Sequence, residues 1–171
     1  MSPDPSRHAD NRNWFESILR YIPGFRGYLE KEYRRETDYL ARTWMADRLQ
    51  RSKVGLDDFM RALVDAAQLD VLPNCERLRS KLDGLISRIR SAVRGYSGIF
   101  DFVRVKENLL DQVYQHDMSL MNGVEKLAAA IESLAGQQDN ASDAVSQVIR
   151  QLDDVQRDFD KRSDLLRGIG D

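Results

Sequence analysis

The sequence predicts an all-α protein, an elongated antiparallel helical bundle of about five helices whose last two form a heptad (coiled-coil-like) hairpin. Apolar residues recur three and four positions apart through 103–134 and again through 141–166. This spacing keeps one stripe of a helix against one partner. No segment shows a convincing strand pattern, and the 32% charged residues suit long helices with much exposed surface.

The chain reads as a flexible N-terminus, 1–12, followed by one helical-bundle domain, 13–171. A short amphipathic helix is expected first and five longer helices after it, at 13–22, 28–51, 56–69, 75–94, 102–135 and 141–167. Glycine, proline and short polar runs predict the breaks. These are Pro23-Gly24, Ser52–Gly55, Leu72-Pro73-Asn74, Gly95–Gly98 and Ala135–Asn140. A helix that continues through 95–98 is the alternative.

Each longer helix is expected to bury one stripe. In 28–51 the stripe is Leu29, Tyr33, Glu36, Leu40, Thr43 and Asp47. In 102–135 it is Val103, Lys106, Leu110, Val113, Asp117, Leu120, Val124, Leu127, Ile131 and Leu134. In the last helix it is Ala141, Val145, Val148, Leu152, Val155, Phe159, Arg162 and Leu166.

Two opposite charges interrupt the last two stripes. The short loop at 135–140 makes these helices antiparallel neighbours, which places Asp117 near Phe159, within one turn of Arg162. A charge at a core position is costly without a partner. We therefore predict a structural polar pair between Asp117 and Arg162. Together with Lys106, these charges are candidates for fixing register or oligomeric state.

The charge is unevenly distributed. Residues 1–104 hold 19 Lys/Arg and 15 Asp/Glu, whereas residues 105–171 hold 7 and 13. The two parts could attract each other within the bundle, or a basic face could meet an anionic partner. The range 75–94 is basic, but no nucleic-acid motif accompanies it, so nucleic-acid binding is not expected.

Catalytic and metal-binding patterns are not apparent. With two histidines and the single Cys75, the sequence offers no zinc or redox pair, and we expect no metal and no cofactor. An incidental, structural Cys75 is favoured over a nucleophile. An enzyme would need an inter-helix pocket around Glu36, Tyr39 or Asp47. The lone cysteine, the polar N-terminus and the lack of an apolar span predict a cytoplasmic protein.

The segment from Trp14 to Phe25, which is rich in aromatic residues, is the most specific functional candidate. Arginines 12, 20 and 26 flank it, and such a helix could dock on a partner or on an anionic membrane surface. The alternative is that it folds back and closes the core. Its candidate docking residues are Trp14, Phe15, Ile18, Leu19, Ile22 and Phe25.

The run Ile22-Pro23-Gly24-Phe25-Arg26-Gly27-Tyr28, followed by Glu30, Glu32, Arg34, Arg35, Glu36 and Asp38, resembles the opening of a family of small uncharacterised bacterial helical proteins. The resemblance covers mainly 22–49. It implies a bacterial, all-helical protein and supplies no activity or site residues. The helical layout is also similar to coiled-coil membrane-stress proteins of the phage-shock type, although the Gly/Pro breaks depart from their uninterrupted hairpin.

These observations favour a non-enzymatic interaction or scaffold protein that works through helix surfaces, with a protein partner or self-association. A peripheral membrane protein docking through 13–25, at the inner face of the membrane, is the alternative. An enzyme with an inter-helix site is the second alternative.

Overall fold

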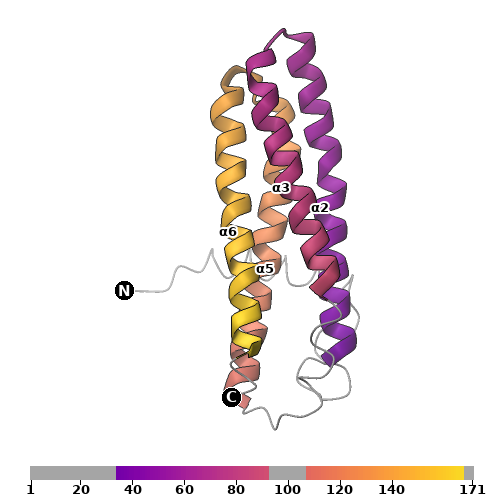
Figure 1. Ribbon diagram of the computed structural model, residues 1–171, viewed down its shortest axis with the longest axis vertical. Helices are drawn as coiled ribbons and strands as arrows, with labels where there is room; N and C mark the ends of the chain where they lie inside the picture. The colour runs from indigo at the N-terminus through magenta and orange to yellow at the C-terminus, as the bar shows by residue number, and fades with distance from the viewer. Residues whose placement is uncertain (1–33, 93–106, 168–171) are drawn as a thin grey trace, which may run out of the picture. The chain divides into compact units, whose positions relative to one another are not determined.

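The computed structural model describes residues 34–92 and 107–167, and this part of the chain is helical without a strand (Figure 1). Its long helices are α2 (Arg34–Asp65), α3 (Leu72–Ser91), α5 (Glu107–Glu132) and α6 (Ala141–Arg167). The expected all-α class is confirmed for these residues, with four long helices in place of five. The chain divides into two compact units, Met1–Ala41 and Arg42–Asp171. In the first, the described residues form only the start of α2.

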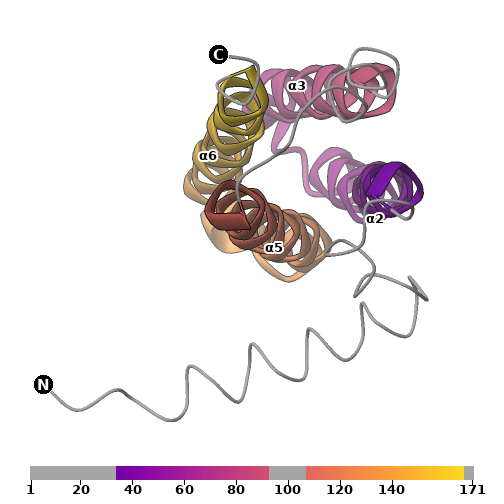
Figure 2. The same cartoon turned by 90° about the horizontal axis from the view of Figure 1, so that it is seen from below.

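Short connections at one end of the second unit join two pairs of helices. After α2, a 3₁₀ turn at Leu69–Val71 leads into α3, and 3₁₀ turns at Ser133–Gly136 and Gln138–Asn140 lead from α5 into α6 (Figure 1). Each connection is too short to cross the bundle, so α2 and α3 run antiparallel, as do α5 and α6. The end view shows the order α2, α3, α6, α5 around the second unit (Figure 2).

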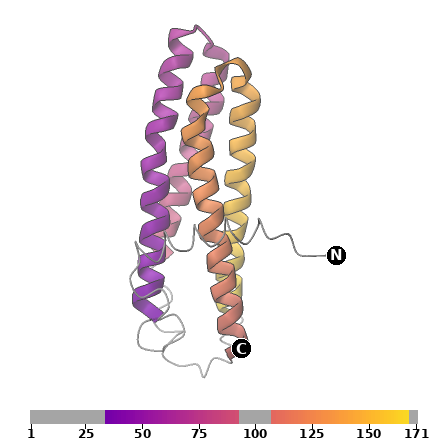
Figure 3. The same ribbon diagram turned by 180° about the vertical axis from the view of Figure 1, so that it is seen from behind.

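The contacts between the two helix pairs are parallel. Lys81 of α3 pairs with Asp153 of α6, and Arg88, seven residues later, pairs with Asp160, seven residues after Asp153. A step along α3 therefore matches a step in the same direction along α6. Likewise, Arg48 of α2 pairs with Glu125 of α5, and Gly55 faces the backbone of Glu132. Figure 3 shows the ribbons of α2 and α5 from this side. The expected antiparallel packing thus holds only within each pair joined by a short turn.

The helices expected at 28–51 and 56–69 are one helix, α2, and the break expected at Ser52–Gly55 is wrong. The hydroxyl of Ser52 donates to the carbonyl oxygen of Leu49 at 2.7 Å, which satisfies this buried group inside the helix. Gly55 faces α5 so closely that an added Cβ would lie 2.8 Å from Cα of Glu132. Glycine here permits a close helix contact rather than a turn.

The stripe expected for 28–51 is also wrong over its described part. Asp47 is exposed, and Leu40 and Thr43 are only half-buried. The side that α2 buries is Arg42, Met45, Leu49, Ser52, Leu56, Phe59 and Leu63. From Arg42 to Leu63 these positions are separated by alternating steps of three and four residues, so they form one continuous stripe. The stripe is hard to recognise in the sequence because it includes a polar serine and a charged arginine.

The end of α2 and the start of α3 also differ from expectation. The helix ends at Asp65 rather than 69, and Ala67 takes a left-handed conformation with φ 57°. Leu72-Pro73-Asn74 was expected to be a break between two helices. Instead Pro73 lies in the first turn of α3, whose N-cap is Val71. Proline suits this position because the first helical N–H groups have no partner inside the helix.

At the positions whose side chains are described, the last two helices follow their expected stripes. In α5 the buried positions include Asp117, Leu120, Val124, Leu127 and Ile131, and Leu134 is buried in the turn that follows. In α6 they are Ala141, Ala144, Val145, Val148, Ile149, Leu152, Val155, Phe159 and Arg162. The expected range of α6 is confirmed, whereas α5 ends three residues earlier than expected.

Several expectations fall outside the described residues. They are the flexible 1–12, the helix at 13–22, the start of the helix at 28–51, the break at 95–98, the positions Val103 and Lys106, and the side chains of Leu110, Val113 and Leu166.

Candidate functional site

The six candidate docking residues lie outside the described part of the chain. They are Trp14, Phe15, Ile18, Leu19, Ile22 and Phe25. The described residues instead offer a buried polar pair, charged helix faces and two surface depressions.

The expected contact between Asp117 and Arg162 is present. Nε of Arg162 donates to Oδ1 of Asp117 at 2.5 Å, and Nη2 donates to Oδ2 at 3.1 Å. The residues are 2% and 3% exposed. Two parallel hydrogen bonds between a guanidinium and a carboxylate are directional, and they satisfy charges that would otherwise be buried at high cost. The pair therefore fixes how α5 and α6 align.

His116 adds a second polar link between the same helices. Its Nε2 lies 2.7 Å from the backbone oxygen of Asp158. A carbonyl oxygen only accepts, so Nε2 carries the hydrogen. The ring is half-buried, and its hydrogen bond holds it against α6. The single internal histidine of the sequence thus acts in helix packing.

Arg48 of α2 joins two carboxylates of α5. Its guanidinium donates to Glu125 at 2.8 Å and to Glu132 at 2.7 Å. The hydrogen bonds to Glu132 and Glu125 raise the pKa of Arg48. The hydrogen bond from Arg48 lowers the pKa of Glu132 below its ordinary value. This network aligns the parallel helices α2 and α5 beside the close contact at Gly55.

Cationic side chains of the basic helix α3 pair with carboxylates on both neighbouring helices, α6 and α2. Toward α6, Lys81 donates to Asp153 at 2.5 Å and Arg88 pairs with Asp160. Arg88 also lies 5.9 Å from the ring centre of Phe159, within range of a cation–π contact. Toward α2, Arg79 pairs with Asp57 and Arg90 lies 3.2 Å from Asp47. The two pairings toward α6 favour the reading in which the basic and acidic parts of the chain attract each other within the bundle, whereas the two toward α2 lie within the basic part.

Cys75 is fully buried at the start of α3. Burial raises the pKa of its thiol to about 11. A thiol that stays protonated at neutral pH is a poor nucleophile. The structural interpretation of Cys75 is supported.

An enzyme would need polar side chains from different helices to converge on one pocket. The described candidate residues do not converge in this way. Tyr39 is exposed, Asp47 is exposed and paired with Arg90, and the side chain of Glu36 lies outside the described residues.

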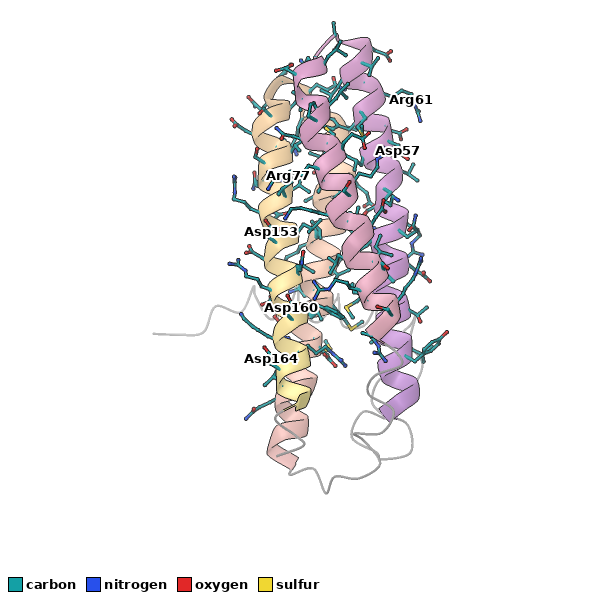
Figure 4. The ribbon with its side chains drawn as sticks, viewed as in Figure 1. Asp57, Arg61, Arg77, Asp153, Asp160 and Asp164 are labelled. Carbon is teal, nitrogen blue, oxygen red and sulfur yellow. The ribbon has the colours of Figure 1, made fainter. Side chains whose placement is uncertain are left out.

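An open depression of about 560 Å³ lies on the α3–α6 face, where Asp153 and Asp160 follow one another along α6 (Figure 4). Its lining is Lys81, Arg150, Asp153, Asp154, Gln156, Arg157 and Asp160. Three of its acids already pair with cations.

A second depression, of about 310 Å³, lies between the turn after α2 and the start of α6. Its acids are Asp70, Asp139 and Asp143. Within the described ranges, no group of three or more His, Cys, Asp or Glu side chains is arranged to hold a metal ion.

Sequence reasoning missed the Arg48 network, the buried Arg42 and the role of Gly55. The signal for the first two was the alternating stripe from Arg42 to Leu63, which places Arg48 at its edge, next to α5. No local signal marks Gly55, because its role depends on the backbone of another helix.

Over the two ranges that the structure describes, no helix is both long and apolar enough to cross a membrane. Comparison of the chain with known protein families, with curated proteins and with solved structures found no match.

Proposed function

We propose that this chain is a non-enzymatic interaction or scaffold protein that works through the surfaces of its helices. In this proposal α5 and α6 pack as a coiled-coil-like heptad hairpin that gives the bundle a fixed register. The observation that carries the proposal is the buried bidentate pair of Asp117 and Arg162. These two charged side chains join α5 to α6. Helical assemblies use polar core residues in the same way to specify register and partner.

The surrounding chemistry supports the same conclusion. Arg48, Lys81 and Arg88 each join a helix of one pair to a helix of the other. The Cys75 thiol is protonated and enclosed. Side chains that hold helices together at fixed positions suit a rigid platform for other proteins.

The proposal is tested with the full chain in two measurements. Sedimentation velocity reports whether it forms a discrete oligomer, and cross-linking in native lysate reports whether a protein partner binds it. We expect at least one specific assembly that is lost on changing exposed bundle residues while the helical circular dichroism is kept. A monomer that cross-links to no protein, or an assembly insensitive to every surface change, would contradict the proposal.

The alternative is a peripheral membrane protein. Seven aromatic or large aliphatic residues between Trp14 and Phe25, flanked by arginines, favour it. The test is flotation with anionic liposomes of the full chain, of a chain starting at Gly24, and of the Trp14→Ala, Phe15→Ala double variant. If only the full wild-type chain floats, residues 13–23 are the membrane anchor. If none floats, the segment belongs to the core or to a protein interface.

A further inference from the structure

Where its side chains are described, the face of α2 opposite its buried stripe carries one exposed large apolar side chain, Val54. Among the described residues, the exposed large hydrophobic side chains are Tyr39, Val54, Val64 and Leu69. All four lie on α2 or in the turn after it. Val54, at the middle of α2 within the second unit, is the most exposed of them at 63%. Single exposed apolar residues are common on protein surfaces, so the charges around Val54 decide whether this face can be a contact surface.

The charges around Val54 are arranged symmetrically and with opposite signs. Asp47 lies seven residues before it and Arg61 seven residues after it, so all three lie on one line along the helix. This line is opposite the buried stripe of α2. Arg51 and Asp58 flank the line on the same side, and both are exposed. Figure 4 shows Arg61 pointing away from the other helices.

We propose that a second copy of this chain docks on this face, with its α2 antiparallel to the first and a two-fold axis at Val54. The two Val54 side chains then meet at the centre. Asp47 of each copy faces Arg61 of the other, and Arg51 of each faces Asp58 of the other. A two-fold contact uses the same surface on both copies, and this face is complementary to itself in that arrangement.

The charge order selects the antiparallel arrangement. A parallel pairing in register would set Asp47 against Asp47 and Arg61 against Arg61, and both of these contacts are repulsive. The charges are also available for exchange, because their present partners are exposed. Arg61 pairs with Asp58 three residues away, and Asp47 pairs with Arg90, with every side chain in these pairs more than half exposed. Exposed pairs of this kind contribute little to stability.

This inference rests on the proposed function, because it names the surface and partner of the self-association. The test is sedimentation velocity of the full chain over a wide concentration range. We expect the wild type to approach twice its 19.7 kDa mass. Arg51→Asp alone sets acid against acid, and Asp58→Arg alone sets base against base, so each is expected to sediment as a monomer. An equimolar mixture of these two variants restores both opposite-charge contacts and is expected to form a heterodimer.

Arg150→Asp is the matched control, because it makes the same change at an exposed arginine of α6. It is expected to dimerise like the wild type. Val54→Asp is expected to be monomeric, and circular dichroism checks that each variant is folded. A dimer that persists in Arg51→Asp and Val54→Asp overturns this docking face and leaves the proposed scaffold function standing. A wild type that is monomeric throughout also overturns it, and cross-linking to another protein then decides the proposed function separately.

Discussion

At the scale of single residues, the described part of the chain shows how buried charges can be placed in a helical core. Asp117 and Arg162 are both buried away from water, and the guanidinium of Arg162 donates hydrogen bonds to the carboxylate of Asp117. Ser52 satisfies itself through the backbone of its own helix. In each case a polar side chain occupies a core position because its partner is already held by the helix geometry.

Removing one member of the buried pair should lower the free energy of unfolding far more than replacing both members with apolar residues. Asp117→Ala leaves the Arg162 cation buried without its carboxylate and is expected to lower the free energy of unfolding by about 3–5 kcal/mol. The double variant Asp117→Leu, Arg162→Leu is expected to recover most of that loss. Urea unfolding of the wild type, Asp117→Ala, Asp117→Leu, Arg162→Leu and the double variant measures this. Losses that simply add in the double variant would show that the two side chains act independently.

The Arg48 network should make stability depend on pH in the acid range. Arg48 lowers the pKa of Glu132 below its ordinary value of 4.5, so the unfolded chain takes up this proton first as the pH falls. The contribution is complete above pH 4.5 and is lost as the pH falls through the folded pKa. Arg48→Gln is therefore expected to be less stable at pH 7 and to lose less of its stability on acidification.

Urea unfolding of the wild type and Arg48→Gln over a series of pH values from 7 downward measures this difference. Lys126→Gln is the control, because it removes an exposed cation of α5. Parallel pH profiles for the wild type and Arg48→Gln would refute the role given to Arg48.

At the scale of elements, α2 shows that a glycine inside a helix has a meaning set by its neighbours. Gly55 allows the α5 backbone to come close, whereas Gly84 of α3 has open space where a Cβ would lie. Both glycines cost their helices conformational entropy in the same way. Only at Gly55 does a contact with another helix compensate for that cost.

These two glycines predict opposite outcomes for the same substitution. Gly55→Ala sets a methyl group against backbone atoms of Glu132 and Ile131, which cannot move as a side-chain end can, so we expect a loss of about 1–3 kcal/mol. Gly84→Ala should stabilise the protein by up to about 1 kcal/mol. Thermal and urea unfolding compare the two. A stabilised Gly55→Ala would mean that α2 and α5 do not approach this closely.

At the scale of the whole molecule, ion pairs join the two helix pairs of the second unit. In the contacts of Arg48, Lys81 and Arg88 with α5 or α6, the cation comes from α2 or α3 and the carboxylate from the other helix pair. The opposite net charges of the two parts of the sequence are thus used where those parts meet. This arrangement favours the observed docking of the pairs over others with the same apolar surfaces.

Charge reversal at one of these contacts should be rescued by the opposite reversal. Lys81→Asp is expected to lower the free energy of unfolding by about 1 kcal/mol, because it sets two carboxylates together at a partly exposed site. Adding Asp153→Lys should restore most of it. The cycle is measured by urea unfolding at low and at high salt, where the coupling should shrink. A coupling of zero at low salt would show that this pair does not contribute to docking.

The sequence by itself determined the helical class, the buried stripes of α5 and α6, the range of α6 and the contact between Asp117 and Arg162. These follow from the period of apolar residues and from a short loop, both of which are local. The tertiary structure decided that α2 continues through Ser52–Gly55, which side of α2 is buried, and that α3 lies parallel to α6. The period of a helix tells which residues share a side, but the identity of the neighbouring helix depends on contacts between residues far apart in the chain.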